Sequence, residues 1–447
     1  MITTSYKMSK SFKEEEQKQK QSLIDSTLSR PAFSDLFRSC LNQPNAVYTG
    51  YYPFRFSRPS MFTIGSNIGS QNNRLQLVAG ARLCSMLVQR LLCMSGQLNS
   101  KNFMKSFSAI LSRRHFFNEE NPIETLAEHR HYHCVYSVAF DKSGEFFVSG
   151  SSDKTARLWR MSAPDKKATC VAILREHLEA VRSVAFHQGP GDRCTIATGS
   201  YDNGVRLWSF SEDCARAACE ATCEATCDAI LTGHTSDVES VIFNKDGTLL
   251  ASASKDGTAI LWSMSKDHKG AVRMSTLRGH ACGISSCAFH PTQRVFVTSS
   301  WDNTVKFWRF SENGKEAICI ETLRGHRDHV LSVAFNESGS LLATGSSDGT
   351  AKLWSVSEGC TRATSVATLT GHFDVSSMVF HRSANLLATA SSEGTVKLWM
   401  FLENGTAATC VKTLRENSRS QVNCLALHPT LPVLLIGISK GTVELYK

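Results

Sequence analysis

Short runs of alternating apolar and polar residues, separated by clusters of Gly, Asn, Asp and Ser, fill residues 121–447. In one segment the runs are Ile320–Leu323, Val330–Phe335, Leu341–Gly345 and Thr350–Trp354. Alternation with a period of two predicts β-strands, and the polar clusters between the runs predict tight turns. The segment is therefore predicted to form a β-meander of four short strands.

The same pattern recurs along the chain. Its copies end in an aromatic residue at intervals of 45 to 54 residues, at Trp159, Trp208, Trp262, Trp308, Trp354, Trp399 and Tyr446. A four-stranded sheet of this size cannot bury both of its faces alone, so neighbouring copies must stack on one another. Closing seven such sheets radially would leave only short, protected edges.

Two further features repeat in register with the aromatic residue. An Asp, or in the sixth copy Glu393, lies six residues before each Trp, and a His lies near the start of each of the first six copies. In four copies the His follows a Gly, at Gly233-His234, Gly279-His280, Gly325-His326 and Gly371-His372. Residues 121–447 therefore resemble the WD40 repeat family of β-propellers.

This resemblance implies an all-β fold, a seven-bladed WD40 β-propeller with four-stranded antiparallel blades. It also implies that each repeat supplies the outer strand of one blade and the three inner strands of the next. The strand Thr442–Tyr446 would then lack an outer neighbour, because the sequence stops at Lys447. An unpaired edge exposes backbone donors and acceptors. We therefore expect Ile123–Ala127 to pair beside the last repeat and close the ring.

The resemblance assigns the recurring polar residues to buried hydrogen-bonded tetrads rather than to catalysis. A buried indole N–H needs an acceptor, and each further buried polar group needs the next. The expected sets are His129/Ser149/Asp153/Trp159, His177/Thr198/Asp202/Trp208, His234/Ser252/Asp256/Trp262, His280/Thr298/Asp302/Trp308, His326/Thr344/Asp348/Trp354 and His372/Thr389/Glu393/Trp399. The extra methylene of Glu393 is predicted to loosen the sixth set. The seventh copy has Asn417, Ile436, Lys440 and Tyr446 at these positions and therefore no tetrad.

Four of the 16 cysteines recur at spacings of five, four and four residues, at Cys214, Cys219, Cys223 and Cys227. A metal or redox site would use such a cluster. The repeat favours a different interpretation, because Ala-Thr-Cys also leads into the outer strand at Cys170 and Cys410. Cys227 takes that position, and the remaining cysteines belong to a loop expanded by duplication of a tetrapeptide. No metal and no cofactor is therefore expected.

Enzyme chemistry is not expected either, so there is no catalytic residue to assign and no small-molecule substrate. The chain has no Gly-rich phosphate cradle, no paired-carboxylate constellation and no Gly-x-Ser-x-Gly elbow. The competing hypothesis is a propeller enzyme, which would line its central channel with titratable groups.

The family uses the propeller as a rigid platform for peptides or proteins, across the face that carries the Gly-His and Asp turns. The exposed positions expected there are Tyr136, Arg182, Tyr201, Glu239, Lys255, Trp301, His329 and Leu331. Trp301 is the only Trp outside the repeated position, and large aromatic residues and Arg often anchor interfaces. The alternative is that these are scattered surface residues without a role.

Charge divides the chain into two parts. Residues 1–120 hold 16 Lys/Arg and 7 Asp/Glu and so carry the whole net charge of +9, whereas residues 121–447 hold 33 of each sign. A neutral propeller argues against a nucleic-acid groove on it. We expect a flexible segment at 1–60 and a basic, acid-poor segment at 61–120, with an amphipathic helix at about 75–94.

The role of this leader stays open between several hypotheses, one of which is that the segment is disordered. Packing against a partner or the propeller, contact with a membrane surface, and organelle targeting all suit a basic, Ser-rich, acid-poor segment. Targeting fits better if translation begins at Met61, because Glu14, Glu15 and Glu16 lie at the start of the full chain. Neither a secretory signal nor a transmembrane helix is predicted.

These observations together predict an intracellular protein–protein interaction scaffold, cytoplasmic or nuclear, that binds peptide or protein partners in a multiprotein complex. One alternative is a substrate receptor of a larger complex such as a ubiquitin ligase, although the Trp-Asp-x-Arg box of some ligase adaptors is absent. A second alternative is an RNA-associated scaffold whose basic leader supplies the charge.

Overall fold

The computed structural model describes residues 122, 124–126, 130–161, 168–188, 193–211, 223, 225–312, 314, 316–382, 385–402, 405–415 and 420–446. The leader of residues 1–120, with its expected segments and helix, lies outside the described residues. In the part of the chain that is described, no helix has the length and apolar character needed to cross a membrane.

The described residues form 28 strands and one short 3-10 helix, η1 (Glu358–Cys360). The strands are β1 (Glu124–Thr125), β2 (Val135–Phe140), β3 (Phe146–Ser151), β4 (Ala156–Met161), β5 (Ala168–Leu174), β6 (Val181–Gln188), β7 (Arg193–Ser200), β8 (Val205–Ser211), β9 (Thr226–Leu231), β10 (Val238–Phe243), β11 (Leu249–Ser254), β12 (Thr258–Met264), β13 (Ala271–Arg278), β14 (Ile284–Phe289), β15 (Val295–Ser300), β16 (Val305–Phe310), β17 (Ala317–Leu323), β18 (Val330–Phe335), β19 (Leu341–Ser346), β20 (Ala351–Val356), β21 (Ala363–Leu369), β22 (Ser377–Phe380), β23 (Leu386–Ala390), β24 (Thr395–Phe401), β25 (Ala408–Arg415), β26 (Val422–Leu427), β27 (Leu434–Ile438) and β28 (Val443–Tyr446).

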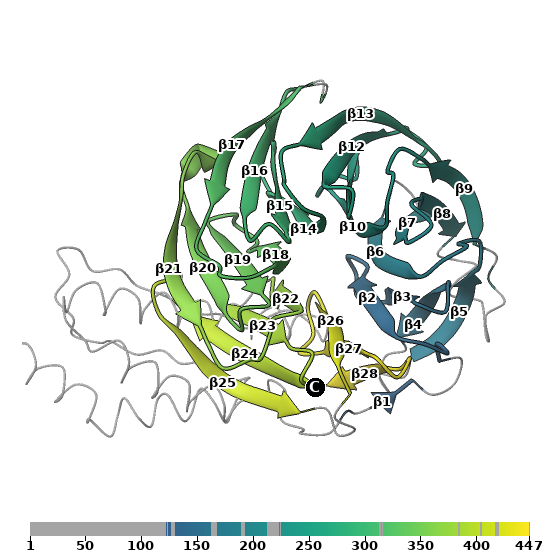
Figure 1. Ribbon diagram of the computed structural model, residues 1–447. Helices are drawn as coiled ribbons and strands as arrows, with labels where there is room; N and C mark the ends of the chain where they lie inside the picture. The colour runs from purple at the N-terminus through teal and green to yellow at the C-terminus, as the bar shows by residue number, and fades with distance from the viewer. Residues whose placement is uncertain are drawn as a thin grey trace, which may run out of the picture. The chain divides into compact units, whose positions relative to one another are not determined.

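These strands form seven four-stranded antiparallel sheets, arranged as blades around a central axis (Figure 1). Blade one is β2–β5, and each later blade takes the next four strands up to blade six, β22–β25. The first strand of each blade lies nearest the axis and the fourth lies on the outside (Figure 1). The predicted seven-bladed propeller is confirmed. We call the face that carries the turns between the second and third strands of the blades the upper face, and the opposite one the lower face.

Blade seven is completed by a strand from the other end of the described chain. Its order is β1-β28-β27-β26, with Glu124 opposite Leu445 and Thr125 opposite Glu444. The Leu126 amide then donates to the Val443 carbonyl at 3.0 Å. The closure predicted for Ile123–Ala127 is present at the described residues Glu124, Thr125 and Leu126, while Ile123 and Ala127 lie outside the described residues. Residues more than 300 positions apart in the sequence thus share one sheet.

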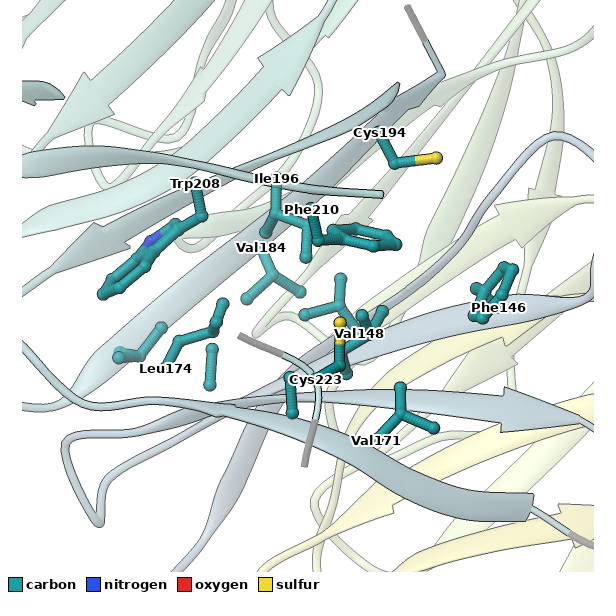
Figure 2. Close-up of a cluster of buried hydrophobic side chains, with 14 residues drawn as sticks. Phe146, Val148, Val171, Leu174, Val184, Cys194, Ile196, Trp208, Phe210 and Cys223 are labelled. Carbon is teal, nitrogen blue, oxygen red and sulfur yellow. The ribbon is translucent and has the colours of Figure 1, made fainter. Parts of the chain in front are cut away.

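Apolar side chains fill the space between neighbouring blades. Between blades one and two, Phe146 and Val148 of β3 pack with Val184, Ile196 and Trp208 of blade two (Figure 2). Because each blade is covered on both faces, its second strand does not alternate between buried and exposed positions, and all six residues of β3 are buried. This two-sided burial is what a single sheet of the repeat could not achieve alone.

Polar bonds also join the inner strands. The Ser137 hydroxyl accepts the Val184 amide at 3.1 Å, and the Ser183 hydroxyl accepts the Val241 amide at 3.0 Å. Where the ring closes, the side-chain amide of Asn423 donates to the Val135 carbonyl at 3.0 Å. Each bond satisfies a polar group beside the axis and fixes one blade against the next.

On the lower face, histidines at the ends of inner strands pack against glycines of the following blade. A Cβ placed on Gly144, Gly247 or Gly339 would overlap the imidazole of His428, His187 or His290, respectively. These glycines have φ angles of +78°, +66° and +77°, in the left-handed region that favours Gly. Two independent reasons thus favour glycine at each position: the positive φ of the turn, and the histidine ring that occupies the place of a Cβ.

Candidate protein-interaction surface

The repeated polar residues form hydrogen-bonded chains at the upper ends of the blades. In blade two, the Trp208 indole N–H donates to Thr198 Oγ1 at 2.9 Å, and Thr198 Oγ1 lies 2.7 Å from His177 Nε2. His177 Nδ1 lies 2.8 Å from Asp202 Oδ2. This order places the imidazole proton on Nδ1, facing the carboxylate, and leaves Nε2 to accept the hydroxyl proton.

Blades three, four and five repeat this chain with a Ser or Thr hydroxyl at its centre. The hydroxyls of Ser252, Thr298 and Thr344 lie 2.8, 2.7 and 2.7 Å from the Nε2 atoms of His234, His280 and His326, respectively. The same hydroxyls accept the indole N–H groups of Trp262, Trp308 and Trp354 at 2.9, 2.8 and 2.9 Å. On the other side of each ring, Nδ1 faces the carboxylates of Asp256, Asp302 and Asp348.

The central hydroxyl residues are fully buried. Ser252, Thr298 and Thr344 are each 0% exposed, like Thr198 in blade two. A partner on the upper face therefore cannot touch them, and they contribute to binding only by holding the strands that carry the surface. Their hydrogen bonds agree with the structural role expected from the sequence and set them apart from the exposed positions of the face.

Each carboxylate also holds the turn that follows it. Asp348 accepts the Thr350 hydroxyl at 2.6 Å and the Arg327 amide at 2.9 Å. Burial acts to raise the pKa of Asp348, but these bonds and His326 outweigh it and bring the pKa down to about 2. Burial lowers the pKa of His326, against the opposing effect of Asp348. A neutral His beside a charged Asp is therefore the stable pair near neutral pH.

The first tetrad requires a correction. His131, and not His129, supplies its imidazole, with Nδ1 at 2.8 Å from Asp153 Oδ2 and Nε2 at 2.8 Å from Ser149 Oγ. His129 lies outside the described residues. The number of residues between the His and its two partners explains this choice. His131 lies 22 residues before Asp153 and 18 before Ser149, which lets its ring lie between them. The same separations occur around His280 in blade four.

The sixth set is looser, as expected from its longer carboxylate. Glu393 Oε1 lies 3.6 Å from His372 Nδ1, and the Glu393 side chain is 38% exposed, whereas the corresponding Asp side chains are almost buried. Thr395 Oγ1 takes the place beside the imidazole, at 3.0 Å from Nδ1. The inner part of the chain is kept, because Thr389 Oγ1 lies within 2.8 Å of both the His372 and Trp399 nitrogens.

The seventh blade replaces the tetrad by apolar packing. Ile436 and Tyr446 are buried, and the Tyr446 hydroxyl donates to Glu444 at 2.9 Å. Lys440 lies in the turn between β27 and β28, and Asn417 lies outside the described residues. Blade seven thus depends on its neighbours and on β1.

The cysteine positions follow the repeat. Cys170, Cys227 and Cys410 lie opposite Trp159, Trp208 and Trp399 in the pairing of the outer two strands. Cys223 is buried against blade one, where its amide donates to the Val171 carbonyl at 2.9 Å (Figure 2). Burial raises the pKa of the Cys227 thiol to about 12. Cys214 and Cys219 lie outside the described residues, within which no group of three or more His, Cys, Asp or Glu is arranged to hold a metal ion.

On the upper face, side chains from five blades form a continuous row around the axis. We call it the aromatic–cation row, and its members in ring order are Tyr136, Arg182, Tyr201, Lys255, Trp301 and His329. The Arg182 guanidinium carbon lies 4.5 Å from the centroid of the Tyr136 ring. Lys255 Nζ lies 4.7 Å from the Tyr201 ring and 5.6 Å from the Trp301 ring. The Trp301 and His329 rings stack with centroids 6.0 Å apart.

Glu239 lies beneath this row and holds its cations. Its Oε2 accepts the Arg182 Nε–H at 2.7 Å, and its Oε1 lies 3.7 Å from Lys255 Nζ. Lys255 also donates to Asp237 at 2.7 Å. Burial acts to lower the pKa of Lys255, but the bond to Asp237 and the nearby Tyr201 and Glu239 outweigh it and raise the pKa. Both cations are thus fixed in place and stay charged.

All eight residues expected at the interface can now be placed. Six of them form the row. The expected exposure of Glu239 is wrong, because its side chain is buried beneath the row, where its carboxylate pairs with Arg182 and Lys255. Leu331 lies on β18, two residues after His329, and is partly buried. The sequence interpretation missed the Thr two residues after most of the tetrad carboxylates, at Thr155, Thr258, Thr304, Thr350 and Thr395. Their regular recurrence is the pattern that could have found them.

The fold and these tetrads define the class of molecule, a seven-bladed β-propeller in which blades one to six carry a Trp–Ser/Thr–His–carboxylate set. The chain belongs to the WD40 family, described as "WD domain, G-beta repeat". The family model matches residues 120–160, 168–209, 225–263, 271–309, 317–355 and 363–400.

Curated relatives share only part of their length with this chain. The probable cytosolic iron-sulfur protein assembly protein 1 of Scheffersomyces stipitis is 27% identical over 139 residues, which are 30% of this chain and 38% of that protein. The ribosome biogenesis protein WDR12 homolog of Arabidopsis thaliana is 30% identical over 131 residues, 29% of this chain and 28% of that protein. The Trichoplax adhaerens homolog is 27% identical over 154 residues, 34% of this chain and 32% of that protein.

Proposed function

We propose that this protein is an intracellular, non-enzymatic scaffold that binds a protein or peptide partner on the upper face of its propeller. The observation that carries this proposal is the aromatic–cation row, in which six side chains from five blades form one surface. Large aromatic residues and Arg contribute most of the binding energy at many protein interfaces. The names of the relatives, which refer to assembly and to biogenesis, agree with a role in a multiprotein complex.

The rigidity of the surface supports the same proposal. The row residues lie on strand ends and tight turns that the tetrads hold, and the Trp301 amide donates to the Gly283 carbonyl at 3.0 Å. Each cation rests on a ring and on a carboxylate, so few rotamers remain to be frozen when a partner binds. A surface ordered in advance loses less conformational entropy on association.

The test is co-purification of partners with the full chain from its native cells. Replacing Tyr201, Lys255 and Trp301 together by Ala removes the centre of the row and is expected to release a stoichiometric partner. The matched control replaces Ile230, Val272 and Ile318 by Ala, which are exposed large side chains on the outer strands β9, β13 and β17. Melting curves of both variants verify the fold. Retention of every partner by the first variant would place binding elsewhere and end the proposal for this face.

The names of the ribosome biogenesis relatives favour one second candidate, an RNA-associated scaffold. In that case the basic leader of residues 1–120 supplies the phosphate contacts, and RNA affinity falls steeply with salt. The measurement is the salt dependence of RNA binding by the full chain and by residues 121–447. Equal binding by the two proteins would exclude the leader as the RNA-binding part.

A further inference from the structure

We infer that the partner segment taken up by the upper face is acidic, with a carboxylate that bridges Arg182 and Lys255 opposite Glu239. This inference rests on the proposed function, because it names the chemistry of the partner at the same surface. It concerns the middle of the aromatic–cation row, where two cations flank one buried carboxylate.

The charges at the middle of the row differ in how far they are exposed to solvent. The Glu239 side chain is 3% exposed, whereas the side chains of Arg182 and Lys255 are 34% and 31% exposed. Glu239 therefore lies below, whereas Arg182 and Lys255 face the solvent beside Asp237, whose side chain is 24% exposed. The four charges sum to zero, but one of the two carboxylates is covered, so the exposed part of the group has an excess of positive charge.

Arg182 and Lys255 have more N–H donors than their bonds to Glu239 and Asp237 use. Arg182 donates to Glu239 through Nε, and its guanidinium lies over the Tyr136 ring. Its terminal nitrogens are not needed for that bond, and a guanidinium can bind a carboxylate through two parallel bonds. Lys255 uses one N–H for Asp237 and has three in all. Glu239 already shows the geometry, because one carboxylate reaches both cations from below.

Aromatic rings flank the two cations. Tyr201 and Trp301 lie on either side of Lys255, and Trp301 also stacks on His329. These rings would contact apolar side chains next to the acidic residue of the partner, which gives the segment an acidic–apolar pattern. A nucleic acid fits less well, because its affinity depends on many phosphate contacts and this surface offers two cations.

The experiment measures binding of three labelled short peptides to the full chain by fluorescence anisotropy. The peptides share their Leu and Trp residues and carry Glu, Gln or Lys at the same remaining positions. We expect the Glu peptide to bind best, and Arg182→Gln or Lys255→Gln to weaken it by about tenfold each. Lys255→Arg keeps the charge and is expected to keep most of the affinity.

The matched control is Lys154→Gln, which removes the same charge from the upper face in blade one. Lys154 is exposed and lies outside the row, and its Nζ is 3.3 Å from Glu179 Oε1. Exposed pairs of this kind contribute little, so the control is expected to bind the Glu peptide as the unaltered chain does. Equal weakening by Lys154→Gln would show a general charge effect and would overturn the inference.

Other results would also overturn the inference of an acidic partner. Equal or tighter binding of the Gln or Lys peptide, or no binding of the Glu peptide at millimolar concentration, overturns an acidic partner. Binding of a single-stranded oligouridylate that Arg182→Gln abolishes, without binding of the Glu peptide, assigns the surface to nucleic acid instead. A cellular partner that still co-purifies with Arg182→Gln and with Lys255→Gln, but not with the triple Ala variant of Tyr201, Lys255 and Trp301, would overturn this inference. The same result would support the proposed function.

Discussion

The imidazole of His428 in blade seven fills the space beside Cα of Gly144 in blade one, where any other residue would place its Cβ. The same ring packs edge-on against Phe140, with centroids 5.1 Å apart. Its Nδ1 accepts the amides of Thr430 and Leu431 at 3.1 and 2.9 Å. One histidine therefore orders its own turn and also fixes the blade at which the ring closes.

A Gly144→Ala substitution should destabilise the propeller through this contact. The positive φ costs a residue with a Cβ about 1–2 kcal/mol, and the overlap with a buried ring adds about 1–3 kcal/mol. The matched control is Gly359→Ala, because Gly359 has a φ of +77° and no atom within 4 Å of its added Cβ. Urea unfolding should show the larger loss for Gly144→Ala. Equal losses would mean that His428 gives way without cost.

Acid should weaken the same junction. Burial, together with the nearby His381, lowers the pKa of His428 to about 4, against a hydrogen bond to the backbone of Gly144. A depressed His pKa means that folding favours the neutral ring, so this stability is full above the unfolded pKa of about 6.5. It is lost as the pH falls from there to about 4, by up to about 3 kcal/mol.

The measurement for this prediction is the free energy of unfolding between pH 7 and pH 4. His428→Gln removes the titrating group, so its stability should fall less steeply with acid than that of the unaltered chain. The comparison uses slopes, because the substitution also changes the packing on Phe140. Parallel slopes for the two proteins would contradict the prediction.

The sixth tetrad should tighten when its carboxylate is shortened. Glu393→Asp is expected to bring the carboxylate from 3.6 Å to hydrogen-bond distance of His372 Nδ1, a gain of about 0.5–1.5 kcal/mol. The thermal midpoint should therefore rise by a few degrees. The reciprocal change Asp348→Glu in blade five should lower it, and a rise in both variants would show that carboxylate length is not the cause.

Closure by β1 should be a large part of the stability of blade seven. Leu126 follows β1 and is buried among Trp159, Leu435 and Leu445. Leu126→Ala should cost about 2–4 kcal/mol, as other core truncations do, and should speed amide exchange in β28. Ile230→Ala, on the exposed side of β9, is the control. Unchanged exchange in β28 would show that blade seven holds without this contact.

The fold could be predicted because its cause is repeated in the sequence. All seven copies carry the same strand pattern and six of them carry nearly the same polar set, so extra residues in one copy, such as those between Trp208 and Cys227, do not hide the register. The tetrad in blade one was misassigned for a local reason, since His129 and His131 both precede β2. The separation of 22 residues from His to Asp in blade four favours His131.

The contacts on the two faces were less predictable. The sequence places Tyr201, Lys255 and Trp301 at equivalent turn positions, but it does not show that Lys255 lies between the two rings. That arrangement depends on rotamers, on Glu239 of β10 and on Asp237, which directly precedes β10. The pairing of His428 with Gly144 joins different repeats, so no pattern within one repeat reveals it.

The histidines of the lower face occur in alternate blades over most of the ring. Blades two and four end their inner strand in Phe-His, and blades one, three and five end it in Phe followed by Asp or Asn. A closed ring can alternate two kinds of blade without interruption only when the number of blades is even. This ring has seven blades, so two neighbouring blades must be of the same kind. These are blades six and seven, which carry His381 and His428. Blade seven is therefore the blade that follows one of its own kind, and it is also the blade whose sheet is closed by β1, which makes it the part of the ring that is expected to open first.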